Sequence, residues 1–138
     1  MSESCIFCEI VKGNIPASKV YEDDNVLCFM DIKPVVTGHV LVIPKTHFRN
    51  ALDTPEDVGS KLYAAVVKIS NAIKKAYNAD GINIIQNNEA ASGQEVFHSH
   101  IHIIPRYEND KLNINKIQRM DVQINDIIKE CEKIKKYF

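Results

Sequence analysis

Three of the five histidines in the chain alternate with other residues inside one apolar stretch, Val96 to Pro105. An alternation of period two is typical of a β-strand, in which every second side chain points to the same face. His98, His100 and His102 are therefore predicted to share one face, with neighbours ~7 Å apart. A buried imidazole needs a partner for each ring nitrogen, so three of them indicate catalysis or ligand binding rather than core filling.

Two kinds of chemistry are open to this histidine strand. Imidazole is a common metal ligand, and it is also a nucleophile that is largely neutral at pH 7, because its unperturbed pKa is about 6.5. One straight strand cannot easily place all three rings on one metal, since the outer two would lie ~13 Å apart. No carboxylate occupies the next positions on the same face. The spacing favours a nucleophilic histidine and leaves open a metal held by two of the rings.

A second candidate site is the pair Cys5-x-x-Cys8 near the start of the chain. Two cysteines at this spacing can hold one tetrahedral zinc ion if two further ligands are available. His47 and His98 are predicted at strand ends, so a Cys2His2 site is chemically reasonable. A redox motif or a pair of buried thiols remains an alternative for the two cysteines.

The polar segment from Gln86 to Glu95 leads directly into the histidine strand. Its amides, its hydroxyl group and Gly93 could donate hydrogen bonds to phosphate oxygens or sugar hydroxyls. A solvated loop without a ligand would have the same composition, so the position before the histidines is what favours binding.

Length and composition indicate one domain over residues 1–138, with a formal net charge of −1. A chain of this length can bury a hydrophobic core, and its net charge shows no excess of positive charge that would indicate nucleic-acid binding. Its apolar runs are too short to cross a membrane, and its first residues do not form a secretion signal. We therefore expect a cytoplasmic protein with reduced cysteines.

The remaining pattern predicts the elements that must position these groups. Thr54 and Pro55 mark a helix start, with the threonine as N-cap and the proline at the first helical position. Cys28 and Cys131 fall on apolar faces and are predicted to be core thiols. The predicted elements are a β-hairpin at 19–21 and 26–30, strands at 39–43 and 82–86, the histidine strand to about 105, a long amphipathic helix after 54 and a C-terminal helix at about 121–136. This succession indicates an α+β fold with an antiparallel sheet.

The run His98-Ser99-His100-Ile101-His102-Ile103-Ile104 resembles the signature of the histidine triad (HIT) family, with Ser99 in place of the usual apolar residue. Four further segments are similar to the Hint-like bacterial branch of this family in the right order. They are Cys5–Ile10, Phe29–Pro34, Gly38–His47 and Gly93–Phe97. The resemblance covers most of the chain, from about Cys5 to Arg106.

This resemblance implies a HIT-like fold with about five antiparallel strands, one long helix and a C-terminal helix, in a homodimer whose sheets join. It also implies a hydrolase that binds purine nucleotides and cleaves a bond at the α-phosphate through a nucleotidyl-histidine intermediate. By position, His100 matches the nucleophile, His102 and His39 line the phosphate site, and Asp31 contacts the ribose hydroxyls.

The resemblance also assigns the loop and the metal site. Asn87, Gly93 and Gln94 match the loop that holds phosphate. Glu95 stands where eukaryotic Hint proteins have a serine that contacts the leaving group. Many bacterial members carry a structural zinc, and the matching ligands are Cys5, Cys8, His47 and His98.

Several functions stay open at this point. The first is hydrolysis of nucleoside phosphoramidates or related nucleotidyl derivatives, and the second is hydrolysis of diadenosine polyphosphates. A nucleotide-binding or scaffold protein with incidental catalysis is the third. A metal-dependent hydrolase that uses the triad as ligands is an unrelated fourth.

Overall fold

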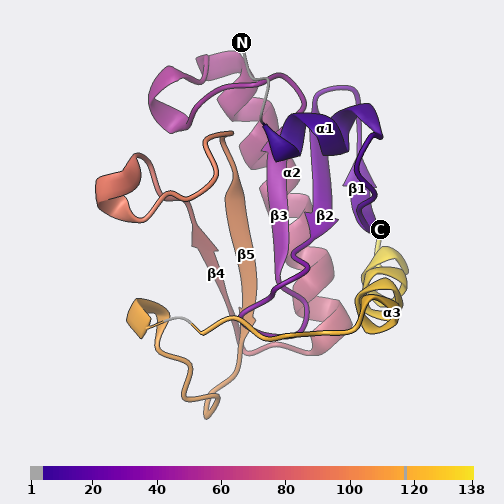
Figure 1. The fold of residues 1–138 in the computed structure, drawn as a ribbon. Helices are drawn as coiled ribbons and strands as arrows, with labels where there is room; N and C mark the ends of the chain where they lie inside the picture. Colours follow the sequence, from indigo (N-terminus) through magenta and orange to yellow (C-terminus); the bar gives the residue numbers. More distant parts are fainter. Residues whose placement is uncertain (1–4, 117) are drawn as a thin grey trace.

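The computed structural model describes residues 5–116 and 118–138. The expectation that the first residues do not form a secretion signal therefore lies partly outside the described residues. Five antiparallel strands form one sheet in the order β1-β2-β3-β5-β4. The strands are β1 (Lys19–Glu22), β2 (Val26–Met30), β3 (Val40–Pro44), β4 (Gly81–Ile85) and β5 (Ile101–Arg106). The helices are α1 (Ile6–Lys12), α2 (Glu56–Tyr77) and α3 (Ile124–Lys135), with 3-10 turns η1 (Ala51–Asp53), η2 (Ala90–Ser92) and η3 (Ile114–Lys116). The predicted α+β class and antiparallel sheet are confirmed (Figure 1).

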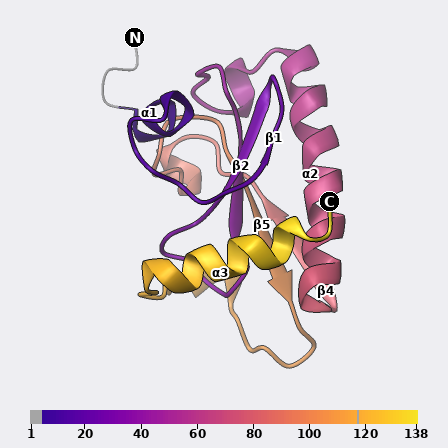
Figure 2. The ribbon, with the colours of Figure 1, turned by 90° about the vertical axis from the view of Figure 1, so that its right-hand side faces the viewer.

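Both faces of the sheet are covered by helices. In the view of Figure 2 the long helix α2 lies on one side of the sheet and the short helix α1 on the other. Every residue of β2 and β3 is buried as a result. Alternate side chains of these strands therefore enter two separate cores.

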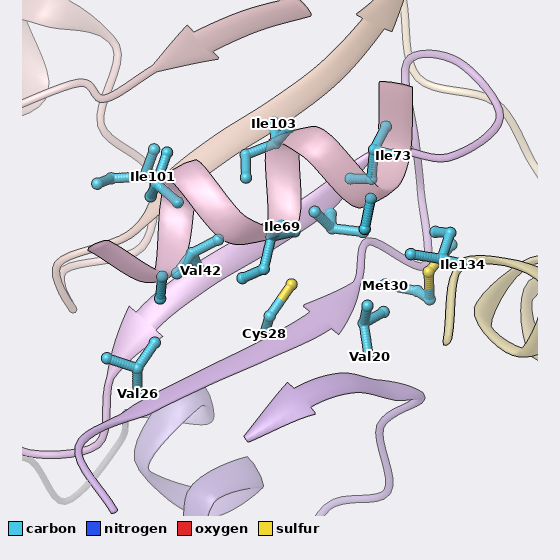
Figure 3. Close-up of a cluster of buried hydrophobic side chains, with 14 of the residues drawn as sticks. Val20, Val26, Cys28, Met30, Val42, Ile69, Ile73, Ile101, Ile103 and Ile134 are labelled. Atoms are coloured by element: carbon cyan, nitrogen blue, oxygen red, sulfur yellow. The ribbon is translucent and has the colours of Figure 1, made fainter. Parts of the chain in front are cut away.

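The larger core lies between the sheet, α2 and α3. Val26, Cys28 and Met30 of β2 point into it and meet Ile69 and Ile73 of α2 (Figure 3). Cys28 and Cys131 both lie in this cluster, which confirms the prediction of buried thiols. The smaller core lies on the α1 side, and its members are Phe7, Ile10, Leu27, Phe29, Leu41 and Ile43. The α1 side is also the side of the polar groups described below.

The start of the long helix differs from the prediction. The helix begins at Glu56, with Pro55 as its N-cap and without a side-chain cap. Thr54 instead ends the turn η1, and its hydroxyl donates to the carbonyl of Asn50 at 2.6 Å. The hydroxyl of Thr54 is therefore engaged in the turn and does not cap the helix.

The histidine strand is shorter than predicted. Strand β5 begins at Ile101, so His98 and His100 precede it. The backbone bends before the strand, where Ser99 N–H donates to the carbonyl of Phe48 at 2.7 Å. The ring centroids of His100 and His102 lie 5.1 Å apart, closer than a straight strand would place them. The shared face is nevertheless retained, because His98 and His100 both pack against the ring of Phe7.

Three other elements differ from the expectations of the sequence. The apolar run at 82–86 is typical of a buried strand, but β4 is an edge strand whose residues are partly exposed. Helix α3 begins at Ile124 instead of about 121, because the residues before it bond to another loop: Met120 N–H donates to the carbonyl of Pro34 at 2.8 Å. Helix α1 was not predicted at all. No helix of the described residues combines the length and the apolar character that crossing a membrane requires.

Candidate active site and metal centre

A cavity of about 900 Å³ opens on the α1 side of the sheet. Its apolar walls come from α1, from the segment after it and from the strands. Its polar groups include Asp31, His39, His100, His102 and Arg119, together with the loop before β5. The structure thus brings His100 and His102 of the triad signature to one pocket with Asp31 and His39, which come much earlier in the chain.

His100 is held in one tautomer by the main chain. Its Nδ1–H donates a 2.7 Å hydrogen bond to the carbonyl oxygen of His98. A neutral imidazole carries one proton, so Nε2 of His100 keeps its lone pair. The ring packs edge-on against Phe7 at 5.3 Å between centroids, which limits its rotation.

His39 and His102 form a short relay with a fixed direction. Val35 N–H donates to Nδ1 of His39 at 3.2 Å, so this nitrogen carries no proton. Nε2–H of His39 then donates to Nδ1 of His102, at 2.9 Å. His102 in turn carries its proton on Nε2. His100 therefore offers a lone pair on Nε2, and His102 offers an N–H donor on Nε2.

Burial lowers the pKa of His39, His100 and His102 and so favours the neutral form of these three rings. Desolvation is the main cause that lowers the pKa of His39 to about 4, against the opposing field of Asp31. Desolvation also lowers the pKa of His102 to about 3, with the neighbouring histidines adding to the effect. The pKa of His100 is lowered for the same reason, although its bond to the His98 carbonyl opposes the shift. A neutral His100 is the form that can act as a nucleophile.

Asp31 has a partner that the sequence did not reveal. Nη1 of Arg119 donates to Oδ2 of Asp31 at 2.8 Å, and Lys33 N–H donates to Oδ1 at 2.9 Å. Nε2 of His39 lies 3.6 Å from Oδ2. Arg119 is 88 positions away in the chain, inside a polar stretch without a motif. No periodicity or spacing could have identified it.

The four predicted metal ligands form one cluster. Cys5 and Cys8 stand at the start of α1, His47 follows β3, and His98 precedes β5. The Sγ and Nδ1 atoms of the four residues all lie within 4.8 Å of one another. Sγ of Cys5 is the N-cap acceptor of α1 and accepts from Cys8 N–H at 3.2 Å. One turn of helix places both thiols on the same side.

The distances in this cluster suit a tetrahedral zinc ion. Zn–S bonds of ~2.3 Å and Zn–N bonds of ~2.0 Å imply S···N edges of about 3.5 Å and N···N edges of about 3.3 Å. The Sγ atoms of Cys5 and Cys8 lie 3.3 and 3.5 Å from Nδ1 of His98, and Nδ1 of His47 lies 3.2 Å from that atom. Nε2–H of His98 donates to the carbonyl of Pro44 at 2.8 Å, which turns the Nδ1 lone pair toward the cluster. The donor set therefore fits zinc.

A second group, Asp31, His39 and His102, also has metal-binding residue types close together. Two of its atoms are already joined by the 2.9 Å bond between His39 and His102. The guanidinium of Arg119 already pairs with Oδ2 of Asp31 at 2.8 Å. A fixed cation beside a dication is unfavourable, so the geometry argues against the triad as a catalytic metal site.

The loop before β5 is fixed by its own side chains. Gln94 is buried, and its amide accepts from Glu89 N–H and Asn50 Nδ2 and donates to the carbonyls of Arg49 and Val96. All four hydrogen-bonding positions of this amide are used inside the protein. We therefore expect the side chain of Gln94 to shape the loop, so that any contact with phosphate comes from its main chain.

Gly93 and Glu89 have unusual backbone angles in the same loop. Gly93 has φ +102°, a backbone conformation that L side chains rarely adopt, so glycine is favoured at this position. Glu89 has φ +78° although it is not glycine. Its carboxylate receives a bidentate bond from Arg49 at 2.9 Å and a bond from Asn50 at 2.6 Å. These bonds hold a strained residue in place in the loop before β5.

Glu95 lines the cavity with an exposed side chain. Its charge raises the pKa of His100 slightly, against the larger effect of burial. Glu95 is therefore within electrostatic reach of the candidate nucleophile. Asn87 also lines the cavity, next to Gly93.

Comparison with known proteins decides the family. The family model of the HIT domain matches residues 12–109. The chain belongs to the HIT family. This family comprises nucleotide-binding hydrolases and transferases, so the recognition from the triad signature is confirmed.

Individual HIT proteins agree along nearly the whole chain. A HIT-like protein from Bartonella henselae is 41% identical, with a TM-score of 0.90, over 100% of this chain and 99% of that one. A zinc-bound histidine triad family protein from Mycobacterium smegmatis is 38% identical, with a TM-score of 0.88, over 99% and 94%. Adenylylsulfatase HINT3 of Arabidopsis thaliana is 47% identical over 81% of this chain but only 57% of its own length.

Proposed function

We propose that this HIT protein hydrolyses nucleotide derivatives at the α-phosphate, through a covalent nucleotidyl intermediate on His100. The pairing of an Nε2 lone pair on His100 with an Nε2–H donor on His102, in one cavity, is the observation that carries the proposal. A binding protein without catalysis would not need a nucleophile held in a single tautomer.

In the first step, Nε2 of His100 attacks the α-phosphorus while the bond to the leaving group breaks. A new N–P bond forms, the leaving group departs with the electron pair, and the imidazole becomes positively charged. The carbonyl of His98 accepts from Nδ1–H and stabilises this charge. In the second step, the oxygen of a water molecule bonds to phosphorus while the N–P bond breaks and its electron pair returns to Nε2. The proton that the water loses passes to solvent, and a nucleoside monophosphate and the neutral histidine are released.

Charge on the phosphoryl oxygens is stabilised by donors around His100. The Nε2–H of His102 is directed by its bond from His39, so it can donate without a change of tautomer. Main-chain N–H groups near Gly93 are the proposed second source, which the glycine brings close to the phosphate. Asn87 completes this side of the proposed phosphate site.

The nucleoside is proposed to occupy the apolar part of the cavity. Side chains of α1 and β2, among them Phe7, Ile10 and Phe29, offer a surface on which a purine can pack. Asp31 at the end of β2 is proposed to accept hydrogen bonds from the ribose hydroxyls. A ribonucleotide would then place its α-phosphate near His100.

We further propose that Cys5, Cys8, His47 and His98 hold a structural zinc ion. The distances support the metal, and four protein ligands leave no open coordination position for a substrate. The ion would tie α1 to the ends of β3 and β5. Because α1 forms one wall of the cavity, this tie would also shape the nucleotide site.

A substrate panel tests the proposed activity. Adenosine 5′-phosphoramidate, diadenosine polyphosphates and adenosine 5′-phosphosulfate differ only in the leaving group at the α-phosphate, and the last is included because of the name of the Arabidopsis relative. We expect release of AMP by the wild type and loss of several orders of magnitude in His100→Ala. Absence of turnover with tight AMP binding would indicate a binding or scaffold protein instead.

A further inference from the structure

Arg119 reaches the nucleotide cavity from outside the region that matches the HIT domain. The match ends at residue 109, and Arg119 lies in the segment 118–121 between η3 and α3. In Figure 1 this segment crosses the sheet on its way to α3. Arg119 lines the cavity, and its charge lowers the pKa of His39, His100 and His102 in addition to the larger effect of their burial.

Two adjacent contacts fix this segment on the loop after β2. Nη1 of Arg119 donates to the carbonyl of Lys33 at 2.8 Å as well as to Asp31. Met120 N–H donates to the carbonyl of Pro34, also at 2.8 Å. The same guanidinium nitrogen therefore joins the segment, the loop and the carboxylate, so the carboxylate and the segment are held as one unit.

The hydrogen bonds leave Asp31 with a defined remaining capacity. A carboxylate has about four acceptor positions, two on each oxygen. Lys33 N–H uses one position on Oδ1, and Arg119 uses one on Oδ2. The 3.6 Å separation from His39 is too long for a further hydrogen bond. One acceptor position thus remains on each oxygen, which suits the two hydroxyls of a ribose diol.

Arg119 also supplies the positive charge that the buried carboxylate of Asp31 needs. Asp31 is 8% exposed, and a carboxylate buried without a partner of opposite charge is costly. The guanidinium of Arg119 offsets this cost by a charge-assisted bond at 2.8 Å. Arg119 occupies one acceptor position and fixes the other two without blocking them.

We propose that Arg119 is a positioning residue that holds Asp31 for the ribose diol and thereby sets the preference of the site for ribonucleotides over deoxyribonucleotides. The inference rests on the proposed function, in which Asp31 binds the ribose. A purely structural Arg119, which only fastened the segment before α3, would affect all nucleotides alike.

The test compares two substrates that differ only in the diol: an adenosine phosphoramidate and its 2′,3′-dideoxy counterpart. Wild type, Arg119→Ala, Arg119→Lys and Asp121→Ala are measured for kcat and KM. We expect Arg119→Ala to raise KM for the ribonucleotide ~10-fold or more, with little change in kcat, because an oriented acceptor pair is lost. The KM of the dideoxy substrate should change less than about twofold, and Arg119→Lys should restore part of the difference.

Asp121→Ala is the matched control. Asp121 pairs with Lys33 at 4.0 Å through exposed side chains and does not touch Asp31. This variant should keep the wild-type ratio between the two substrates. Because the ratio is taken within each variant, a smaller folded fraction cannot change it.

The outcomes separate this inference from the proposed function. An equal effect of Arg119→Ala on both substrates, or no effect on either, would overturn the role of Arg119 while leaving the hydrolase intact. If the wild type turned over neither substrate, the proposed function would fail. The affinities for AMP and 2′,3′-dideoxy-AMP, measured by calorimetry, would then replace the two KM values in the comparison. Equal affinities in the wild type would overturn the inference as well.

Discussion

The carbonyl oxygen of His98 accepts the 2.7 Å hydrogen bond that orients His100. The side chain of His98 belongs to the Cys/His cluster, while its main chain holds the candidate nucleophile. The proposed metal site and the candidate nucleophile are therefore coupled through one residue. A displacement of His98 would turn the Nε2 lone pair of His100 away from its orientation in the cavity.

Zinc content and zinc removal test this coupling. We expect one zinc per chain in protein purified without added metal, and a large loss in Cys5→Ser. Because structural zinc contributes directly to folding, chelation should lower Tm by an amount on the order of 10 °C and reduce kcat as well. Cys131→Ala, which removes a buried thiol outside the cluster, should keep its zinc. Zinc content near zero in the wild type would disprove the metal site.

The pH dependence follows from the buried relay of His39 and His102. Burial lowers the pKa of His39 to about 4 and that of His102 to about 3, both below the ordinary value near 6.5. The relay works only while both rings are neutral, and His100, whose pKa burial also lowers, must be neutral to attack, so the acid limb of kcat/KM should lie below 6.5. A pH profile with its acid limb centred at 6.5 would contradict the relay.

The same shifts give a stability effect with a definite sign. Between pH 6.5 and 4 the unfolded chain binds protons at these two histidines, while the folded protein does not. The free energy of unfolding should therefore decrease as the pH falls through this window, by up to ~1.4 kcal/mol per pH unit for each histidine. Urea unfolding at several pH values measures this slope.

Glu95 is predicted to act as a general acid toward the leaving group. It lines the cavity within electrostatic reach of His100, on the side of the loop before β5. We expect Glu95→Gln to slow substrates with poor leaving groups, such as simple amines, and to leave nitrophenol-like esters nearly unchanged. Equal rates for wild type and variant on both kinds of substrate would assign Glu95 to the solvated surface.

A homodimer is predicted from the open edge of the sheet. Among the described strands β4 pairs only with β5, and Ile84 on β4 is 43% exposed. Pairing of two β4 edges would join the sheets and cover this side chain. Light scattering at micromolar concentration should give twice the chain mass of 15.6 kDa, and Ile84→Lys should shift the protein toward the monomer and weaken its activity. Ile128→Lys, at a similarly exposed position on α3, is the control.

Local sequence patterns predicted most of the fold. Short apolar runs at 26–30 and 39–43, bounded by turn residues, located two central strands, because both faces of these strands are buried and their side chains are apolar. The apolar stripe of the long helix likewise matches its buried residues. Helix α1 was missed because it is only seven residues long. Its N-cap is Cys5, and a cysteine is not one of the residue types by which a helix start is recognised in a sequence.

The site could be predicted only where its residues carry a motif. The triad signature and the Cys-x-x-Cys pair identified the histidines and the thiols that the structure brings together. Arg119, Arg49 and Glu89 have no such signal, because each acts through a partner that is at least 40 positions away. The bend before β5 was equally hidden, since a main-chain bond to Phe48 produces it.

The most direct test of the account is the covalent state of His100. A slowly hydrolysed adenosine phosphoramidate, quenched in acid-free conditions during the first turnover, should give protein with the added mass of one nucleotidyl group. Peptide mapping should place that group on His100, and His100→Ala should show neither the adduct nor turnover while its Tm stays close to the wild type. Turnover by His100→Ala near the wild-type rate, or an adduct on another residue, would contradict the central claim.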